Sequence, residues 1–427
     1  MKRVKIALVG CGTVGSAFVD LLLKQAVEIE RRQGVKLELA KILTRSPTGA
    51  KCHSIYDRYP DLFVDNMESI LRDPEIRIVV ESVGGEGFAK DVVISSILWG
   101  KNVVTANKAF LNNYWFEIFD LARDNGVSIG YEAAVAGAVP IIRVVQESFP
   151  GRQIKSIAGV LNGTTNFILS EMERRKESLE TVLKEARDLG YAEADPSDDL
   201  FGIDARNKLS ILMRAVWGLN FDPETIYAQG IEDIIPEDFE YADKKLGSSI
   251  RLVAYCDDAG TGFVCPMFVP KDDLLARVPR QLNGIKIAGD DFGEISFIGP
   301  GAGGRETATA VLADVVKIAR GTLKNDEASR SDKSELRGFE DIMFRHTLRF
   351  IVNDRPGIIR DISSVLADEG ISIQAVEQND YPDSKSSALP FLITLHPIEE
   401  KSVQAALEKI NRFAFLVKPV VVFRSFV

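Results

Sequence analysis

Short, mainly apolar runs alternate with segments of helical periodicity through the first third of the chain. Val4–Val9 and Ile76–Val80 have the character of strands that are covered on both faces of a parallel sheet. Between them, Phe18, Leu21 and Leu22 recur at helical spacing. Further strands are expected at Val35–Leu43, Asn102–Thr105 and Val127–Tyr131. The pattern predicts an α/β domain with a doubly wound parallel sheet over residues 1–133.

A second pattern covers residues 134–299. Helices are expected at Ile141–Phe149, Phe167–Arg175 and Leu179–Leu189, with a strand at Ile154–Leu161 and one or two more within Gly284–Ile298. This segment is assigned to an α+β catalytic and dimerisation domain. A helix follows at Ala308–Ile318, and residues 300–320 are expected to complete the first domain.

Residues 321–346 are rich in charge and lack apolar periodicity, so they are interpreted as a linker. Residues 347–427 then show a βαββαβ order, which predicts a small ferredoxin-like domain. Its expected strands and helices are Thr347–Val352, Ile358–Glu369, Ile371–Asn379, Leu389–His396, Lys401–Arg412 and Val417–Phe423. No catalytic constellation is found there, which favours a binding or regulatory role.

Composition excludes several function classes. Hydrophobic residues make up 45% and charged residues 27% of the chain, as in ordinary globular proteins, and the net charge of −10 argues against nucleic-acid binding. The first apolar segment is too short for a secretory signal or a membrane span. Cys11, Cys52, Cys256 and Cys265 form no CxxC pair, so neither a zinc site nor a disulfide framework is expected. A reducing, cytoplasmic location fits this pattern best.

The glycine motif after the first strand predicts dinucleotide binding. Gly10 allows a tight turn, Gly12 lets the backbone approach a pyrophosphate, and Gly15 lets the helix pack closely. The helix amino end then faces the phosphates. The expected cofactor-binding residues of this Rossmann fingerprint are Gly10, Gly12, Thr13, Val14 and Gly15.

The end of the second strand bears on cofactor choice. An Asp or Glu there would bind the ribose hydroxyls of NAD, whereas this chain has Arg45 followed by Ser46. Arg45 therefore favours a 2′-phosphate and NADP(H), with NAD(H) possible. The alternative is that Arg45 is only a solvated loop residue.

Further candidates follow other strand ends, where ligands gather in such sheets. Ser82 and Gly84 lie in a glycine loop, and Lys108 emerges at the same edge, facing a ligand or only capping a loop. A second glycine loop, Gly299–Thr309, includes Gly303. It is either a phosphate nest or a tight packing turn.

The stretch Tyr191–Lys208 concentrates acidic residues around a lysine. Asp204 and Lys208 lie four positions apart and share one face of a helix. A surface salt bridge is one interpretation, but the apolar surroundings favour burial. Because the chain has only three scattered histidines, a lysine or a carboxylate is expected to move the proton in any acid–base chemistry.

With these motifs in place, the first 320 residues resemble homoserine dehydrogenases. The similar stretches are Gly10–Gly15, Val103–Lys108, Tyr131–Gly137, Gly159–Asn166, Gly190–Pro196 and Gly299–Thr307. The tail resembles an ACT domain through Leu348–Gly357 and Gly370–Ile373. ACT domains commonly bind amino acids at subunit interfaces.

The resemblance implies a function and a set of sites. NAD(P)H would reduce L-aspartate 4-semialdehyde to L-homoserine in threonine, methionine and isoleucine biosynthesis. Lys208 would donate the proton with Asp204 as its partner, Glu193 and Asp199 would hold the substrate, and Lys108 would lie between nicotinamide and substrate. The resemblance also implies a sodium or potassium site at Glu132, Val135, Gly137 and Val139, and an L-threonine site at Asn353, Asp354, Gly357 and Ile358. A homodimer or homotetramer is expected.

Two other functions remain open from the sequence. Another NADP-linked semialdehyde or hydroxy-acid reductase could share the nucleotide-binding half. A non-catalytic amino-acid sensor could keep the fold only to bind nucleotide, although Lys108, Glu193, Asp204 and Lys208 argue against it. The tail could also be a dimerisation module without a ligand.

Overall fold

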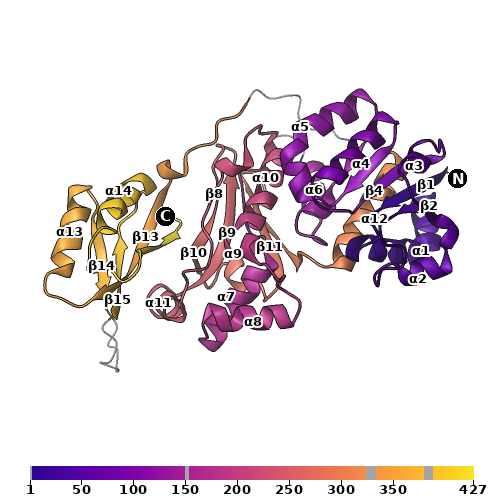
Figure 1. Cartoon of the computed structure of the whole chain (residues 1–427). Helices are drawn as coiled ribbons and strands as arrows, with labels where there is room; N and C mark the ends of the chain where they lie inside the picture. The colour runs from indigo at the N-terminus through magenta and orange to yellow at the C-terminus, as the bar shows by residue number, and fades with distance from the viewer. Residues whose placement is uncertain (1, 150–152, 324–332, 379–387) are drawn as a thin grey trace.

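The structure is a computed structural model that describes residues 2–149, 153–323, 333–378 and 388–427. A parallel sheet with its helices lies at one end of the elongated molecule (Figure 1). A larger mixed sheet occupies the middle and continues into the C-terminal domain at the other end. The mixed α/β class and the three-part architecture that the sequence predicts are confirmed.

The N-terminal sheet has six parallel strands in the order β3-β2-β1-β4-β5-β6. These strands are Phe63–Val64, Val35–Leu43, Lys2–Val9, Ile76–Glu81, Asn102–Thr105 and Ile129–Gly130, respectively. Because β1 lies between β2 and β4, the strand order reverses beside it, at the place where doubly wound sheets bind ligands.

Helices cover both faces of this sheet. One face packs against α1 (Thr13–Gln33) and α12 (Gly304–Arg320), and the other against α4 (Gly87–Leu98) and α5 (Lys108–Asp124). Two short helices, α2 (His53–Arg58) and α3 (Glu68–Leu71), follow β2 and β3. Since α12 comes after the middle domain in the chain, the first domain closes its core only with a late segment.

The second sheet runs through two domains in the order β12-β11-β7-β9-β10-β17-β13-β15-β14. In that order its strands are Gly293–Pro300, Leu282–Gly289, Ser156–Val160, Ser248–Asp257, Gly262–Pro270, Val421–Ser425, Met343–Asn353, Ala388–Leu395 and Ile373–Glu377. Two short strands, β8 (Tyr227–Ala228) and β16 (Ile398–Glu399), pair with β10 and β13. The last strand of the chain therefore lies beside a strand of the middle domain.

Helices of the middle and C-terminal domains complete the layers (Figure 1). The middle domain contributes α6 (Ile141–Glu147), α7 (Gly163–Arg175), α8 (Leu179–Asp188), α9 (Ser197–Leu200), α10 (Ile203–Trp217) and α11 (Pro236–Leu246). The C-terminal domain contributes α13 (Ile358–Asp368) and α14 (Glu400–Ile410). No helix among the described residues is both long and apolar enough to cross a membrane.

Some boundaries differ from the predicted ones for local reasons. The helix predicted from Phe167 begins at Gly163, because the side chain of Asn162 accepts a hydrogen bond from the Thr165 amide and caps it (2.8 Å). The β9–β10 hairpin carries no alternating pattern, since nearly every residue in it is buried, and it was not predicted. Burial on both faces removes the period-two signal.

Candidate active site

A cavity of about 560 Å³ opens at the carboxyl edge of the N-terminal sheet. Gly10, Gly12, Arg45 and Ser82 line it together with Lys51, so the structure brings these four predicted cofactor residues to one place. Lys51 was missed because it lies in an irregular segment eight residues beyond the end of β2 at Leu43. The cavity also borders Asp65, which lies beyond β3.

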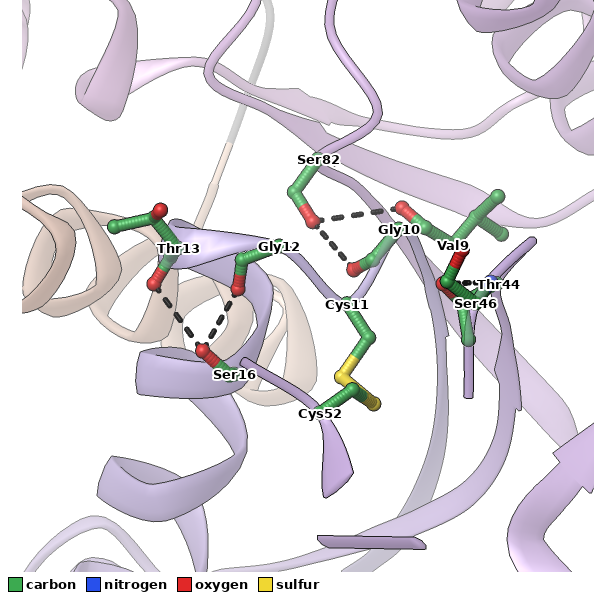
Figure 2. The surroundings of a disulfide bond; sticks show 10 residues. All are labelled: Val9, Gly10, Cys11, Gly12, Thr13, Ser16, Thr44, Ser46, Cys52 and Ser82. Atoms are coloured by element: carbon green, nitrogen blue, oxygen red, sulfur yellow. Dashed lines mark hydrogen bonds between the residues drawn. A yellow bond between two sulfur atoms is a disulfide. The ribbon is translucent and has the colours of Figure 1, made fainter. Parts of the chain in front are cut away.

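The glycine loop fits tightly against the end of β4. Gly10 has φ +95°, and a Cβ there would come within 2.7 Å of the Ser82 carbonyl. A Cβ on Gly15 would lie 2.1 Å from the Gly10 oxygen, so only glycine allows this approach of α1. Figure 2 shows the Ser82 hydroxyl donating to the Gly10 carbonyl oxygen (2.8 Å). Thr13 and Val14 begin α1 directly behind this turn.

A disulfide joins Cys11 of the glycine loop to Cys52, which lies beyond β2 (Figure 2). Both residues are buried and line the cavity, and their Cα atoms are 5.7 Å apart. The prediction that the cysteines form no disulfide framework is therefore wrong for this pair. The two cysteines are 41 positions apart and meet because β1 and β2 are neighbours. The cysteine argument for a reducing compartment loses its basis, and the cytoplasmic location stays a prediction.

A buried carboxylate organises the loop after β4. Glu81 is fully buried and accepts hydrogen bonds from the amides of Val83 (2.7 Å) and Gly84 (3.2 Å). Its other oxygen accepts from the hydroxyl of Thr105 in β5 (2.5 Å). Glu81 was not among the predicted site residues, although its place directly after the apolar run Ile76–Val80 could have pointed to it. This network fixes the loop that carries Ser82 and Gly84.

The neighbouring helix start is tied to this loop. Asn107 caps α5, and its amide nitrogen donates to the Gly85 carbonyl oxygen (2.5 Å). Lys108 is the first residue of α5, with its side chain 36% exposed. Lys108 therefore stands at the carboxyl edge of the sheet, next to the loop that borders the nucleotide cavity.

Asp204 lies between two lysines. One of its carboxylate oxygens pairs with Lys108, and the other accepts from the Lys208 ammonium (2.6 Å). Lys208 also donates to the Leu161 carbonyl oxygen (2.7 Å). Asp204 is 8% and Lys208 6% exposed, so the surface salt-bridge interpretation is wrong.

Asn162 completes this cluster and was missed as a site residue. Its amide nitrogen donates to Asp199 (2.5 Å) and to Asp204 (2.8 Å). The signal available in the sequence was an asparagine at the end of the strand expected at Ile154–Leu161. Four elements thus meet here, namely the end of β7, the start of α5, the short helix α9 and the start of α10.

Burial and charge shift the pKa values of the cluster in different directions. Burial lowers the pKa of Lys208, and Asp204 opposes this shift only in part. Burial also acts to lower the pKa of Lys108, but the Asp204 carboxylate outweighs it and raises that pKa. For Asp204, burial would raise the pKa, yet the two ammonium groups prevail and lower it. Lys208 is thus the more acidic of the two cations.

The two predicted substrate carboxylates lie in different environments. Asp199 belongs to α9, is partly buried, and has a pKa that burial raises. Glu193 is exposed in the loop between α8 and α9. Within the described residues, no hydrogen bond or ion pair joins Glu193 to the cluster. The structure therefore brings Asp199, Asp204, Lys108 and Lys208 together, and the role of Glu193 stays a prediction.

The loop after β6 carries the predicted cation-site residues. Glu132 is buried, and its carboxylate accepts from the amides of Ile142 (3.0 Å) and Arg143 (2.9 Å) at the start of α6. Burial raises the pKa of Glu132, and burial together with Glu132 raises that of Asp314 to about 7. Gly137 has φ +50° and lies against Gly301, between the buried residues Val135 and Val139.

The second glycine loop makes close packing contacts. A Cβ on Gly304 would lie 2.8 Å from Thr13 of the fingerprint, and one on Gly301 would lie 2.1 Å from Asn283. Gly303, with φ +125°, lies between them as the N-cap residue of α12. These contacts support the packing-turn interpretation, and a cofactor contact of Gly303 stays a prediction.

The predicted effector residues form the turn between β13 and α13. Asn353 ends the strand and is exposed, as is Asp354. Gly357 has φ +93° and Ile358 is buried at the start of α13. The four residues are contiguous in space, and their role in binding threonine stays a prediction.

These features define a class of protein. A doubly wound sheet with a glycine-loop cavity, joined through the start of α5 to a buried lysine–carboxylate cluster, is the architecture of a nicotinamide-dependent dehydrogenase. Three family models match the chain. They are "Homoserine dehydrogenase, NAD binding domain" over residues 10–132, "Homoserine dehydrogenase" over residues 140–316 and "ACT domain" over residues 346–415.

Curated relatives match over nearly the whole length. The homoserine dehydrogenase of Neisseria gonorrhoeae is 36% identical over 99% of both chains. That of Pseudomonas aeruginosa is 35% identical over 99% of this chain and 98% of its own. Among solved structures, a homoserine dehydrogenase from Thiobacillus denitrificans superimposes with a TM-score of 0.86 at 35% identity, covering 99% of this chain and 98% of that one. The chain belongs to the homoserine dehydrogenase family, and it is an oxidoreductase with a nicotinamide cofactor.

Reduction of the Cys11–Cys52 disulfide is expected to destabilise the protein. The cross-link closes a loop of about forty residues, which corresponds to about 4 kcal/mol of unfolding free energy. Urea unfolding with and without dithiothreitol measures the difference. Cys256 and Cys265 are free thiols, so this reductant acts on one disulfide. A Cys11→Ser, Cys52→Ser double variant should respond equally in both conditions, and an unchanged wild-type midpoint would contradict the prediction.

Proposed function

We propose that this chain interconverts L-aspartate 4-semialdehyde and L-homoserine with NADP(H). The observation that carries the proposal is the buried cluster of Lys208, Asp204 and Lys108 beside a dinucleotide-binding fold. When bound, the reduced nicotinamide supplies a hydride to the aldehyde carbon. The oxygen that becomes negative then needs a cation and a proton.

Lys208 fits that task by position and charge. Two of its three N–H groups are used, one by Asp204 and one by the Leu161 carbonyl, which leaves one for a ligand oxygen. Its lowered pKa makes the ammonium a better proton donor than an exposed lysine. Asp204 keeps the side chain in place. Lys108, paired with the same carboxylate, adds a second positive charge near the developing alkoxide.

Two carboxylates are proposed to hold the substrate. Asp199 lies beside the cluster through Asn162 and is suited to accept a hydrogen bond from the homoserine hydroxyl. Glu193 would take the ammonium group, for which the loop between α8 and α9 would have to close over the site. This contact would select for aldehydes that carry an α-amino group.

NADP(H) is proposed as the preferred cofactor. Arg45 and Lys51 border the cavity and could both bind a 2′-phosphate, whereas the strand end carries no carboxylate. Gly84, Lys108 and Gly303 are proposed to contact the same cofactor from the neighbouring loops. A hyperthermophilic archaeal homoserine dehydrogenase solved in complex with NADPH is 29% identical, with a TM-score of 0.64 over 76% of this chain.

A monovalent cation is proposed near the loop after β6. The carboxylate of Glu132 and the carbonyl oxygens of Val135, Gly137 and Val139 are hard oxygen donors, the type that sodium and potassium prefer. Ala136 has φ +53°, a left-handed conformation that is unusual for a residue with a side chain and that re-aims the neighbouring carbonyls. The cation would stabilise this loop and take no part in the transfer of hydride or proton.

The C-terminal domain is proposed to bind L-threonine at the turn around Asn353 and Asp354, which would give feedback inhibition in threonine, methionine and isoleucine biosynthesis. The ACT match supports a small amino-acid effector.

Pairing of ACT sheets between copies of the chain would give a homodimer or homotetramer. The proposed division of the chain remains 1–133 completed by 300–320, then 134–299, a linker at 321–346, and 347–427.

The proposed reaction is tested by following the absorbance of reduced nicotinamide with L-aspartate 4-semialdehyde. NADPH should be consumed, and an aldehyde of equal length without the amino group should react far more slowly. Consumption of neither NADPH nor NADH would overturn the proposal.

L-Threonine should inhibit the enzyme, and Asp354→Ala should weaken that inhibition while the exposed control Asp368→Ala does not. Equal inhibition of all three proteins would place the threonine site elsewhere, and no inhibition of any of them would point to another effector.

Lys208→Ala is expected to lower kcat by about 10²–10⁴-fold, because the developing alkoxide loses its proton donor. The dissociation constant of NADPH, measured by fluorescence titration, should change little, since Lys208 does not line the nucleotide cavity. Lys184→Ala is the matched control, a lysine exposed on α8. Equal losses in turnover and in nucleotide affinity would argue against the role of Lys208.

Arg45→Ala is expected to raise the KM for NADPH by about tenfold to a hundredfold, the cost of one charge-assisted hydrogen bond, and to leave the KM for NADH nearly unchanged. Steady-state kinetics with both cofactors measure the two values. Arg58→Ala, at an exposed arginine of α2, serves as the control. An equal rise in the KM values for NADPH and NADH would show that Arg45 does not bind the 2′-phosphate.

A further inference from the structure

The last strand of the chain holds an arginine in a fixed position against the middle domain. Arg424 is 2% exposed, and its guanidinium makes a two-point contact with Glu400 of α14 (2.7 and 2.6 Å). Glu400 is fixed in turn by a hydrogen bond to His346 of β13 (2.9 Å). A bidentate pair of this kind sets both the place and the plane of the guanidinium.

The third nitrogen of the Arg424 guanidinium contacts a residue of the middle domain. Its Nη1 donates to the side-chain oxygen of Gln229 (2.6 Å), and the Gln229 amide nitrogen donates to the Val422 carbonyl oxygen (3.4 Å). The backbone N–H of Gln229 bonds to the Val264 carbonyl of β10 (2.8 Å). Gln229 is therefore held from β17 on one side and from β10 on the other.

The residues after Gln229 pack against the turn that joins α9 to α10, the helix that carries Asp204 and Lys208. The Ile231 amide donates to the Leu200 carbonyl oxygen (2.9 Å). A Cβ on Gly230 would lie 2.1 Å from that same oxygen and 2.7 Å from the Cα of Phe201. The two backbones are joined directly by the hydrogen bond from Ile231 to Leu200, so a shift of residues 229–231 displaces the turn.

Two members of the cluster flank that turn. Asp199 lies in α9 just before it, and Asp204 lies in the first turn of α10 just after it. Gly202 joins the two with φ +78°, and a Cβ there would meet the Gln229 carbonyl oxygen at 3.4 Å. The backbone of Gln229 thus touches the residue from which α10 starts.

We propose that Gln229 and Arg424 are positioning residues for the active site. The C-terminal domain, through Arg424, sets the position of residues 229–231, and these set the α9–α10 turn that aims Asp199 and Asp204. The inference rests on the proposed function in two respects, namely that Asp199 and Asp204 act on the substrate and that the C-terminal domain binds an amino-acid effector. It assigns the contact through which an effector bound to the C-terminal domain reaches the lysine cluster.

A purely structural role makes a different prediction. If the contact only holds two domains together, breaking it lowers stability and affects all kinetic constants alike. If it positions Asp199 and Asp204, breaking it changes the constants for homoserine and spares those for the nucleotide, because the nucleotide cavity is lined from the other sheet. The split between the two substrates separates the roles.

The test compares Gln229→Ala with Gln229→Glu and with Gln25→Ala, an exposed glutamine of α1. Gln229→Ala should raise the KM for homoserine and weaken inhibition by L-threonine, each on the order of threefold to tenfold, with the KM for NADP⁺ unchanged. Gln229→Glu keeps an acceptor for Arg424 and should restore most of both. Unchanged homoserine and threonine constants in Gln229→Ala, or an equal change in the NADP⁺ constant, would overturn the proposal.

Hydrogen exchange gives a reading that does not depend on turnover. In Gln229→Ala, the amides of residues 200–206 should exchange faster, whereas those of α1 should not. Equal exchange in wild type and variant would refute the contact as a positioning device. If wild type consumed no NADPH, the proposed reaction would fail, and faster exchange at residues 200–206 would still establish the mechanical link.

Discussion

The structure depends most on the charge balance around Asp204. Taking one carboxylate and one ammonium out of water costs several kcal/mol for each ion, and this is offset only when the hydrogen bonds around them are complete. Lys108, Lys208 and Asn162 complete those of Asp204, and the Leu161 carbonyl completes those of Lys208. Since Lys108 comes from the first domain and the other groups from the middle domain, the cluster also fixes how the two domains meet.

Local sequence patterns were enough for the parts of the fold whose physics is local. The apolar strand, glycine turn and amphipathic helix at the start of the chain follow from steric rules, and Gly10 and Gly15 occupy positions that no other residue could fill. The spacing of Asp204 and Lys208 gave their shared helix face. Their burial was inferred from neighbouring apolar residues, and the structure confirms it.

Features that depend on distant pairing were not predictable in the same way. The Cys11–Cys52 disulfide requires knowing that β1 and β2 are adjacent, and Asn162 becomes a site residue only when β7 meets α10. The C-terminal domain was expected to be joined to the rest of the chain only by a linker. Instead, β17 pairs with β10 of the middle domain, at Arg424 and Met267. Nothing in the local pattern of Val421–Ser425 distinguishes a partner within its own domain from one outside it.

The position of α12 has a consequence for how the chain is made. Residues 304–320 supply Ala308, Val311 and Val315 to the same core as Phe18 and Leu22 of α1. During synthesis the first domain leaves the ribosome without this helix, so the part of the sheet face that α1 does not cover stays exposed until most of the chain has been produced. A fragment that ends near residue 133 would carry that apolar face permanently and would be prone to aggregate.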